Sequence, residues 1–380
     1  MLSYLYLYLT KISIINRLIC TFTKNNHMLK YSKIKSPTFF IKKSIARENI
    51  SRMMSKLPNS CTFRPHFKTH NNKFTAKIFQ ELGIDKITVS SVEMAMNFRS
   101  LGFRDITIAF PFNPREHKRL NKLCSNTKLG ITISNIQSAK AISKMQTIEA
   151  SAWIEIDTGY KRSGISWDNY ENIEECIKII HNTKHLKFLG FINHNGETYY
   201  LHEKSEILKS TKESIRKMLE IKNKFSKYNA QISIGDTPGC SFLTSFEGID
   251  EIRPGNFVYY DLMMLEKGVC TINNVAATVL CQIVDINPER KELVIHGGAI
   301  HFSKELIDIN GNKVFGKVVK HIGREKSDIE EYIYSLSQEH GIIKLANTDV
   351  SNFKIGDLLE IIPVHSCLTA NLMKGKTLHY

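Results

Sequence analysis

The stretch Phe63-Arg64-Pro65-His66-Phe67-Lys68 is the first of eight predicted strands, most of them short apolar runs, and this series indicates the fold. The other seven runs are Ile87–Ser90, Ile106–Phe110, Gly130–Ser134, Trp153–Asp157, Phe188–His194, Gln231–Gly235 and Phe257–Asp261. Continuous apolar strands with longer segments between them are typical of a parallel sheet that is covered on both faces.

The segments between these runs have the apolar spacing of amphipathic helices. Clear examples are Val92–Leu101, Ile136–Met145, Tyr170–His181 and Lys204–Phe225. Eight strands that alternate with helices predict an α/β fold, a (β/α)8 barrel of the TIM type, rather than an open doubly wound sheet. No G-x-G-x-x-G motif follows the first run, which weakens the dinucleotide-binding alternative.

The pattern changes after about Gly268. Val275–Ile286 and Glu292–His296 are rich in β-forming residues and are joined by a turn at Asn287–Lys291, and Asp357–Pro363 alternates as a further strand. We therefore predict three parts: an N-terminal extension (residues 1–34), a barrel (residues 35–267) and a C-terminal all-β domain (residues 268–380) packed on the barrel.

Composition and charge narrow the functional classes. The chain has 380 residues, of which 42% are hydrophobic and 23% charged, as is typical of a globular protein. Its net charge is +15, but nine Lys or Arg residues and no acidic residue lie within residues 1–47. The remaining charge of +6 is scattered over 333 residues without a basic-aromatic motif, so we expect no nucleic-acid partner.

The first 27 residues lie outside the barrel pattern. The apolar segment Ile12–Phe22 is interrupted by Asn16 and Arg17 and is too short for a membrane span, so we expect no membrane partner. The lack of acids fits a mitochondrial leader, whereas the single arginine does not. An extension without a role before Met28, or a signal or anchor segment, are the alternatives.

The cysteines bear on the compartment. Eight cysteines are spread widely without a C-x-x-C pair, which indicates reduced thiols of an intracellular protein rather than a disulfide framework. We therefore predict a cytoplasmic protein, or a mitochondrial one if residues 1–27 are a leader.

Lys68 is the leading candidate for chemistry. It stands at the end of a predicted buried strand, where a charged and unpaired amine is unfavourable. A partly desolvated lysine loses its proton more readily and then forms a Schiff base with an aldehyde such as pyridoxal 5′-phosphate (PLP). The alternative is a solvated lysine at a strand end, and the heptapeptide Arg64–His70 alone does not separate the two.

Further polar, ionisable and turn-forming residues follow the predicted strands, where barrel enzymes carry their reacting groups. They are His70, Ser90, Ser91, Pro111, Asp157, Arg162, His194 and Tyr199.

The loop Ile234–Ser241 has the composition of a phosphate site. Its glycines, Gly235 among them, let backbone N–H groups approach an anion, and Thr237 adds a hydroxyl donor. Asp236 would repel phosphate, so its side chain is expected to turn away or to bind a loop amide. A tight strand-to-loop turn is the alternative.

The C-terminal strand is followed by His365-Ser366-Cys367. In an extended segment, residues two apart project to the same face, so one imidazole and one thiolate can bind the same metal. Nitrogen with sulfur favours zinc over magnesium or manganese, and water or substrate would complete the coordination. Ordinary buried side chains are the alternative.

Five motifs, taken in order, carry a resemblance to a known family. They are Arg64-Pro-His-Phe-Lys-Thr-His70, Ile154-Glu-Ile-Asp-Thr-Gly-Tyr-Lys-Arg-Ser-Gly164, Ser233-Ile-Gly-Asp-Thr-Pro238, Glu339-His-Gly341 and Pro363-Val-His-Ser-Cys-Leu-Thr369. The chain resembles the D-threonine aldolase / D-serine dehydratase family, the metal-dependent branch of the alanine-racemase-like (fold type III) PLP enzymes. The similarity covers about residues 35–375.

The resemblance implies a set of cofactor contacts. Lys68 would form the Schiff base with PLP, Arg162 would hydrogen-bond its pyridine nitrogen, and Tyr199 would lie near its ring. Gly235 and Thr237, with the adjoining backbone, match the family's phosphate site.

The resemblance also implies that His365 and Cys367 are metal ligands. The family's ligand pair ends in Asp in many aldolases and in Cys in the zinc-dependent serine dehydratases, so Cys367 favours a dehydratase. One departure weakens this inference: the family's usual His-x-Gly-His-Ser-Tyr run is replaced here, and Glu197 stands at its second histidine.

We therefore predict a lyase that acts on a D-3-hydroxy amino acid with PLP and a divalent metal, zinc first and manganese or magnesium as alternatives. If Lys68 removes the α-proton, the products are an oxo acid and ammonia; if His70 deprotonates the β-hydroxyl, a retro-aldol cleavage follows. An amino-acid racemase and a non-catalytic PLP-binding protein are the rival hypotheses. We expect a homodimer.

Overall fold

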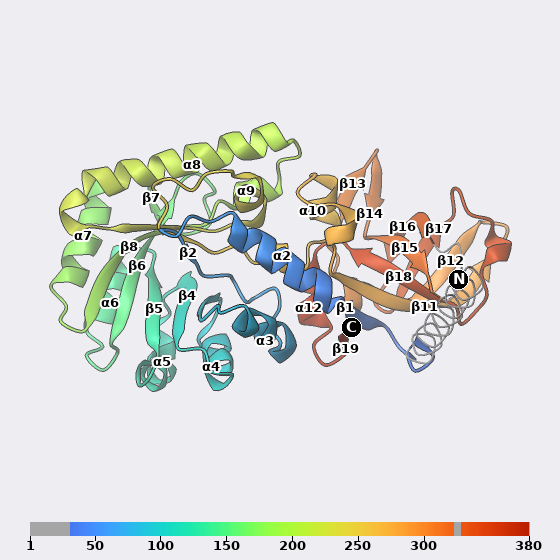
Figure 1. Cartoon of the computed structure of the whole chain (residues 1–380), viewed down its shortest axis with the longest axis horizontal. Coiled ribbons are helices and arrows are strands. Elements are labelled where there is room, and N and C mark those ends of the chain that lie inside the picture. Colours follow the sequence, from blue (N-terminus) through green and yellow to red (C-terminus); the bar gives the residue numbers. More distant parts are fainter. Residues whose placement is uncertain (1–30, 323–327, 380) are drawn as a thin grey trace, which may run out of the picture. The chain divides into compact units, whose positions relative to one another are not determined.

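The computed structural model describes residues 31–322 and 328–379, which form two compact units (Figure 1). The first, called the barrel unit, comprises residues 41–277 with 365–371 and 379. The second, called the β unit, comprises residues 31–40, 278–322, 328–364 and 372–378. The predicted extension at residues 1–34 lies almost wholly outside the described residues.

Among the described residues, eight parallel strands form the ring of the barrel unit, and a further short parallel strand lies off this ring. The strands of the ring are β2 (Thr62–Phe63), β3 (Lys86–Val89), β4 (Asp105–Pro111), β5 (Lys128–Ile133), β6 (Ala150–Asp157), β8 (Leu186–Asn193), β9 (Gln231–Ile234) and β10 (Glu251–Ile252). Their order in the sheet is β2-β10-β9-β8-β6-β5-β4-β3. A parallel bridge between His66, after β2, and Thr88 of β3 joins the two ends of this order. The predicted (β/α)8 barrel is therefore confirmed.

Helices follow the strands in the predicted alternation. The longer ones are α2 (Lys43–Ser55), α3 (Lys73–Glu81), α4 (Val92–Ser100), α5 (His117–Cys124), α6 (Ile136–Ser143), α7 (Tyr170–His181) and α8 (Lys204–Lys224). The short elements are β7 (Ile165–Ser166), α9 (Thr237–Phe242), α10 (Leu262–Glu266), α12 (Ser366–Leu372) and 3₁₀ turns at Pro114–Glu116, Gly196–Tyr199, Ser226–Tyr228, Asn256–Val258 and Ile272–Asn274.

Several of these helices begin at a side chain that caps a free backbone N–H group. The caps are Asn72, Ser91, Asn135, Asn169, Asp236 and Asp261, and each accepts a hydrogen bond from the first turn of its helix. Such residues immediately before a helix fix where it starts, and so they fix the length of each βα loop.

The eighth strand is not where the sequence predicted it. The run Phe257–Asp261 contains a 3₁₀ turn, and the strand is β10, at Glu251–Ile252. Pro254 has no N–H group to continue the ladder, so strand pairing ends before it. Phe257 is nevertheless fully buried, so its apolar run resembles a strand in sequence. In the same way, β2 ends at Phe63, before Pro65.

A buried polar network crosses the inside of the barrel. Arg64 forms ion pairs with Glu251 and Asp105, so it connects β2 to β10 and β4. Glu251 accepts a hydrogen bond from Ser233 at 2.7 Å, and Ser233 accepts one from Arg253 at 2.7 Å. This chain of contacts satisfies the charges inside the barrel and fixes Arg253 just after β10.

The β unit is antiparallel and confirms the predicted all-β region. Its strands are β1 (Thr38–Ile41), β11 (Ala277–Asn287), β12 (Glu292–His296), β15 (Gly316–His321), β16 (Asp328–Leu336), β17 (His340–Lys344), β18 (Leu358–Pro363) and β19 (Thr377–His379), with some end residues belonging to the barrel unit. The order β12-β17-β16-β15-β18-β11, with a further pairing of β11 with β12, closes six strands into a small barrel. The hairpin β13 (Ile307–Ile309) with β14 (Asn312–Val314) and the short helix α11 (Ala299–Phe302) complete the unit. In the part of the chain described here, no helix has both the length and the apolar character that crossing a membrane requires.

Candidate active site

Lys68 lies in the turn that follows β2. Hydrogen bonds hold this turn on two sides: the Phe67 N–H group donates to Thr88 of β3 at 2.8 Å, and the His66 N–H group donates to Pro254 at 2.9 Å. Phe67 is fully buried against other aromatic rings, whereas the Lys68 side chain is exposed. The packed Phe67 therefore fixes the backbone from which Lys68 projects.

The surroundings of Lys68 favour its neutral amine. The pKa of Lys68 is lowered, chiefly because the surrounding protein removes hydration from its amine, although the residue as a whole is exposed. The Cys367 thiol acts in the opposite direction, and the positive charges of Arg162 and Arg253 lower the pKa further. A lysine in this environment has the nucleophilic amine that a Schiff base requires.

Two histidines, His66 and His194, lie near Lys68. His66 was not predicted, and His194 was named only as a residue that follows a strand, without a catalytic or binding role. Burial lowers the pKa of His66 well below its usual range and that of His194 to about 3, and the positive charge of Lys68 adds to both effects. His194 Nδ1 contacts the Gly235 carbonyl, so Nδ1 carries the proton and Nε2 is free to accept. Both residues follow strands of the barrel, and this position is the feature of the sequence that could have identified them.

His70, the predicted base, lies in the aromatic core. It is fully buried, stacks on Phe79 with 4.8 Å between ring centroids, and lies 4.4 Å from the Phe67 ring. Burial lowers its pKa to about 3, and neither ring nitrogen has a hydrogen-bond partner among the described residues. His70 therefore contributes to the packing of the aromatic cluster with Phe67 and Phe79. Its role as the base that deprotonates the β-hydroxyl stays a prediction.

The loop after β9 has the features expected of a phosphate site. The Thr237 N–H group donates to the Tyr199 hydroxyl at 3.2 Å, and the Thr237 hydroxyl accepts the Phe257 N–H group at 3.2 Å. Asp236 turns aside, as expected: it accepts hydrogen bonds from the Gly239 N–H group at 2.5 Å and from Thr198 at 3.0 Å. The structure therefore brings Gly235, Thr237 and Tyr199 together and directs the carboxylate of Asp236 elsewhere.

Arg162 projects from a loop organised by Asp157, which accepts the N–H groups of Gly159 and Lys161 at 2.9 and 3.0 Å. Its guanidinium lies 5.4 Å from the centroid of the Tyr160 ring. Arg162 is exposed, and its charge lowers the pKa values of both Lys68 and His194. Contact with a pyridine nitrogen stays a prediction for this residue.

Arg253 is a second arginine near Lys68, and it too was missed. It is buried and donates to Asn193 at 2.5 Å and to Ser233. Burial lowers its pKa to about 10, although Glu251 raises it. No charge run or motif in the sequence distinguished Arg253 from the other arginines.

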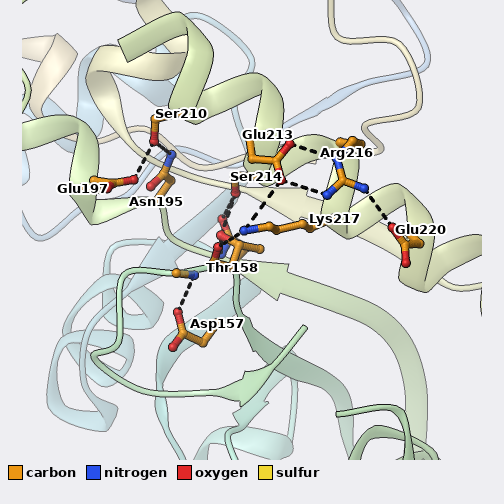
Figure 2. Close-up of polar contacts among 12 residues, drawn as sticks. Asp157, Thr158, Asn195, Glu197, Ser210, Glu213, Ser214, Arg216, Lys217 and Glu220 are labelled. Atoms are coloured by element: carbon orange, nitrogen blue, oxygen red, sulfur yellow. Dashed lines mark hydrogen bonds and ion pairs between the residues drawn. The ribbon is translucent and has the colours of Figure 1, made fainter. Parts of the chain in front are cut away.

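Glu197, which departs from the family motif, faces helix α8. Figure 2 shows that its carboxylate faces Ser210, which donates to it at 2.9 Å and accepts a hydrogen bond from Asn195 at 3.0 Å. Farther along α8, Lys217 donates to the Thr158 carbonyl at 2.8 Å. Glu197 therefore connects the loop after β8 to α8 by a hydrogen bond. It is not among the groups that shift the pKa of Lys68.

His365 and Cys367 lie within the barrel unit, not in the β unit where the sequence placed them. The extended geometry predicted for them is also wrong, because helix α12 begins at Ser366. Burial alone would raise the pKa of the Cys367 thiol, but His365, Lys68 and Thr69 together leave it lowered. The Cys367 Sγ atom lies 3.1 Å from Thr69 Oγ1, so the predicted metal ligand contacts the neighbour of Lys68.

These residues fit the two groups that the sequence implied. An amine of lowered pKa beside two arginines suits an aldehyde that carries a phosphate, and the only carboxylate in the glycine loop is turned aside. A thiol of lowered pKa that interacts with an imidazole is a donor set that zinc prefers. Lys68, Gly235 and Thr237 would hold PLP, and His365 and Cys367 would hold the metal.

A second group of candidate ligands lies in the β unit. One ligand atom from each of His296, His301 and Glu339 lies within 4.8 Å of the others. His301 is buried, and burial lowers its pKa to about 4, so the ring is neutral. Its Nδ1 accepts the Gly298 N–H group at 3.2 Å, which leaves the proton on Nε2 and no lone pair there for a metal. This arrangement does not favour metal binding.

Comparisons with known proteins agree with this geometry. The family model described as the N-terminal domain of alanine racemase matches residues 41–262, more than half of the chain. The chain belongs to this family. A second model, described as a putative serine dehydratase domain, matches residues 276–377.

Two curated relatives are similar over almost their whole lengths. The D-serine dehydratase of Dictyostelium discoideum is 29% identical over 370 residues, which cover 89% of this chain and 92% of the relative. The D-threo-3-hydroxyaspartate dehydratase of Delftia sp. is 26% identical over 352 residues, covering 88% and 92%.

Solved structures share the fold. The Delftia dehydratase superimposes with a TM-score of 0.83 at 24% identity and covers 90% of this chain and 93% of that one. The D-threonine aldolase of Filomicrobium marinum has a TM-score of 0.74 at 16% identity and covers 89% and 90%. The family predicted from the five motifs is confirmed.

Proposed function

We propose that this chain is a PLP-dependent lyase that removes ammonia from a D-3-hydroxy amino acid such as D-serine, assisted by zinc at His365 and Cys367. The observation that carries the proposal is the contact between Cys367 and Thr69, because it brings a metal-type ligand beside the Schiff-base lysine. A racemase or a PLP carrier has no need of a thiol and an imidazole at that place.

The relatives support the reaction type. Both curated relatives described above are named dehydratases of D-amino acids that carry a 3-hydroxyl group. A cysteine mutant of a D-threo-3-hydroxyaspartate dehydratase has been solved in what is described as the metal-free form. A D-threonine aldolase shares the fold, so cleavage of the Cα–Cβ bond is the second candidate reaction.

The chain's own residues would divide the chemistry as follows. PLP, when bound, supplies an electron sink for the α-carbon, and a divalent metal supplies a Lewis acid for the β-hydroxyl. Lys68, with its lowered pKa, has the neutral amine needed first as nucleophile and then as base for the α-proton. His194 stays neutral, so its Nε2 is available to accept a proton near Lys68.

The same residues would bind and orient the substrate. Arg162 and Arg253 contribute positive charge near Lys68, which favours an anionic cofactor and a substrate carboxylate. Tyr199 has its oxygen occupied by the Thr237 N–H group, so its hydroxyl proton remains free to donate. We further propose that the protein is a homodimer in the cytoplasm, or in mitochondria if residues 1–27 are a leader.

A substrate assay tests the proposal. The purified protein, supplied with PLP and zinc, is incubated with D-serine, D-threonine and D-threo-3-hydroxyaspartate, with and without a chelator. We expect an oxo acid and ammonia in equal amounts from the first and third substrates and their loss with chelator. Glycine from D-threonine would indicate an aldolase. Chelator-resistant formation of L-serine would support a racemase, and the absence of any product would support a carrier.

A further inference from the structure

Two buried polar side chains, Asp261 and Asn256, form hydrogen bonds with the segment that carries the predicted metal ligands. Asp261 is fully buried and Asn256 is 3% exposed, and both come from the segment that follows β10. Neither residue was predicted from the sequence to bind the cofactor or the metal. Buried polar groups of this kind are retained where their hydrogen bonds fix a geometry.

Asp261 connects two helices that are far apart in the sequence. One carboxylate oxygen, Oδ1, accepts the Met264 N–H group at 3.0 Å and so caps helix α10. The other, Oδ2, accepts the Ser366 N–H group at 2.9 Å. Ser366 lies between His365 and Cys367 and begins α12, so this bond holds the backbone that carries both ligands.

Asn256 reaches the same segment through its side-chain amide. Its Nδ2 donates to Asp261 Oδ2 at 2.5 Å, to Ser366 Oγ at 3.2 Å and to Cys367 Sγ at 3.7 Å. The preceding residue, Gly255, packs closely against the turn that carries Lys68, because a Cβ atom added at Gly255 would lie 2.8 Å from the His66 carbonyl oxygen and 3.0 Å from Thr69 Oγ1. The turn that carries Lys68 and the segment that carries the ligands thus meet at Gly255 and Asn256.

We propose that Asp261 and Asn256 are positioning residues that hold His365 and Cys367 in the arrangement required to bind one divalent metal beside Lys68. The inference rests on the metal site of the proposed function. Asp261 also interacts electrostatically with His365, as a carboxylate that orients a metal-binding histidine would. Because two protein ligands are predicted, the geometry of that pair would determine most of the metal affinity, and loss of such support typically weakens affinity about 10–100-fold.

The test measures metal affinity directly. Zinc is titrated into the metal-free, PLP-loaded protein against a chromogenic chelator, for the wild type, Asp261→Asn and Asn256→Ala. In the wild type the two carboxylate oxygens of Asp261 accept hydrogen bonds from Met264, Ser366 and Asn256. Asp261→Asn replaces one of these oxygens with an NH2 group, so at least one donor loses its acceptor. We therefore expect a dissociation constant for zinc raised about 10–100-fold. Asn256→Ala keeps the contacts of Asp261 to Met264 and Ser366, and we expect a smaller loss of the same kind. Bound PLP, measured by absorbance, should stay unchanged in both.

A matched control separates positioning from simple loss of a helix cap. Asn169→Ala removes the cap of α7, where Asn169 accepts the Asn172 N–H group at 3.2 Å, and should leave zinc affinity unchanged. Excess zinc should restore turnover in the Asp261 variant without a change in KM, which a misfolded site would not show.

The possible results separate failure of the proposed metal site from failure of the positioning role. If the wild type binds no zinc that depends on Cys367, the proposed metal site fails, and this inference fails with it. If the wild type binds zinc and both variants bind it within twofold of the wild type, only the positioning role is refuted. If Asp261→Asn does not fold, Asn256→Ala decides the question by the same criterion.

Discussion

The buried carboxylate of Asp236 predicts a specific pH dependence of stability. Asp236 is 4% exposed; it caps α9 by accepting the Gly239 N–H group and also accepts the Thr198 hydroxyl. Burial raises its pKa from the ordinary 3.8 to about 6, although its hydrogen bonds to Gly239 and Thr198 and the charge of Arg253 act in the opposite direction. The folded protein therefore holds a proton on Asp236 at pH values where the unfolded chain has lost it.

The sign and size of the effect follow from that difference. The contribution of Asp236 to the unfolding free energy falls as pH rises from about 4 to about 7, by about 3 kcal/mol in total. Asp236→Asn removes this titration. We therefore expect the stability of the variant relative to wild type to increase by about 2–3 kcal/mol between pH 4 and pH 7. Any change in the cap itself is independent of pH and cancels in that comparison.

Urea unfolding followed by circular dichroism, at intervals between pH 4 and pH 7.5 and without added PLP, provides the assay. The control is Asp308→Asn, an exposed aspartate that also accepts a backbone N–H group, from Gly311 at 2.7 Å. Its difference from wild type should stay within about 0.5 kcal/mol across the range. A free-energy difference for Asp236→Asn that does not change with pH would refute the reasoning.

Two further predictions concern the metal ligands and the barrel. His365→Ala and Cys367→Ala should each lose bound zinc and reduce lyase turnover by about 100-fold or more, while the absorbance of bound PLP is kept. Cys367→Asp should shift the metal preference toward manganese. Unchanged zinc content in the alanine variants would refute the ligand assignment. Gly190→Ala should unfold the protein or lower its stability by more than about 3 kcal/mol, because the added Cβ would lie 2.1 Å from the Gln231 carbonyl oxygen at a φ of +151°. Gly159→Ala, at φ +140° with no atom within 4 Å, is its control for backbone strain alone, and equal losses in the two variants would contradict the steric argument.

The barrel could be predicted because its apolar strands and amphipathic helices alternate along the chain. The eighth strand was misplaced, because Phe257 is buried in a 3₁₀ turn and burial alone gives no indication of backbone conformation. The strand at Glu251–Ile252 has only two residues and one of them is charged, so no apolar run marks it. Glu251 is buried there because it pairs with Arg64, a contact across 187 residues that a local pattern does not contain.

The candidate site was predicted in part, and the reason is similar. Lys68 and Cys367 were identified by motif, but the 3.1 Å contact between Cys367 and Thr69 joins residues 298 positions apart. The extended geometry assumed for His365-Ser366-Cys367 was wrong because Asp261 accepts the Ser366 N–H group where α12 starts. Arg253 was missed because its nearness to Lys68 depends on closure of the barrel, which brings β10 beside β2.

The central claim is that Lys68 carries PLP, and one measurement tests it most directly. The protein is loaded with PLP, reduced with borohydride, digested and mapped by mass spectrometry, with Lys68→Ala treated in parallel. We expect a visible absorbance band that disappears on reduction, a pyridoxyl group on the peptide that contains Lys68, and neither feature in the variant. A protein that takes up no PLP, or a pyridoxyl group on another lysine with Lys68 unmodified, would contradict it.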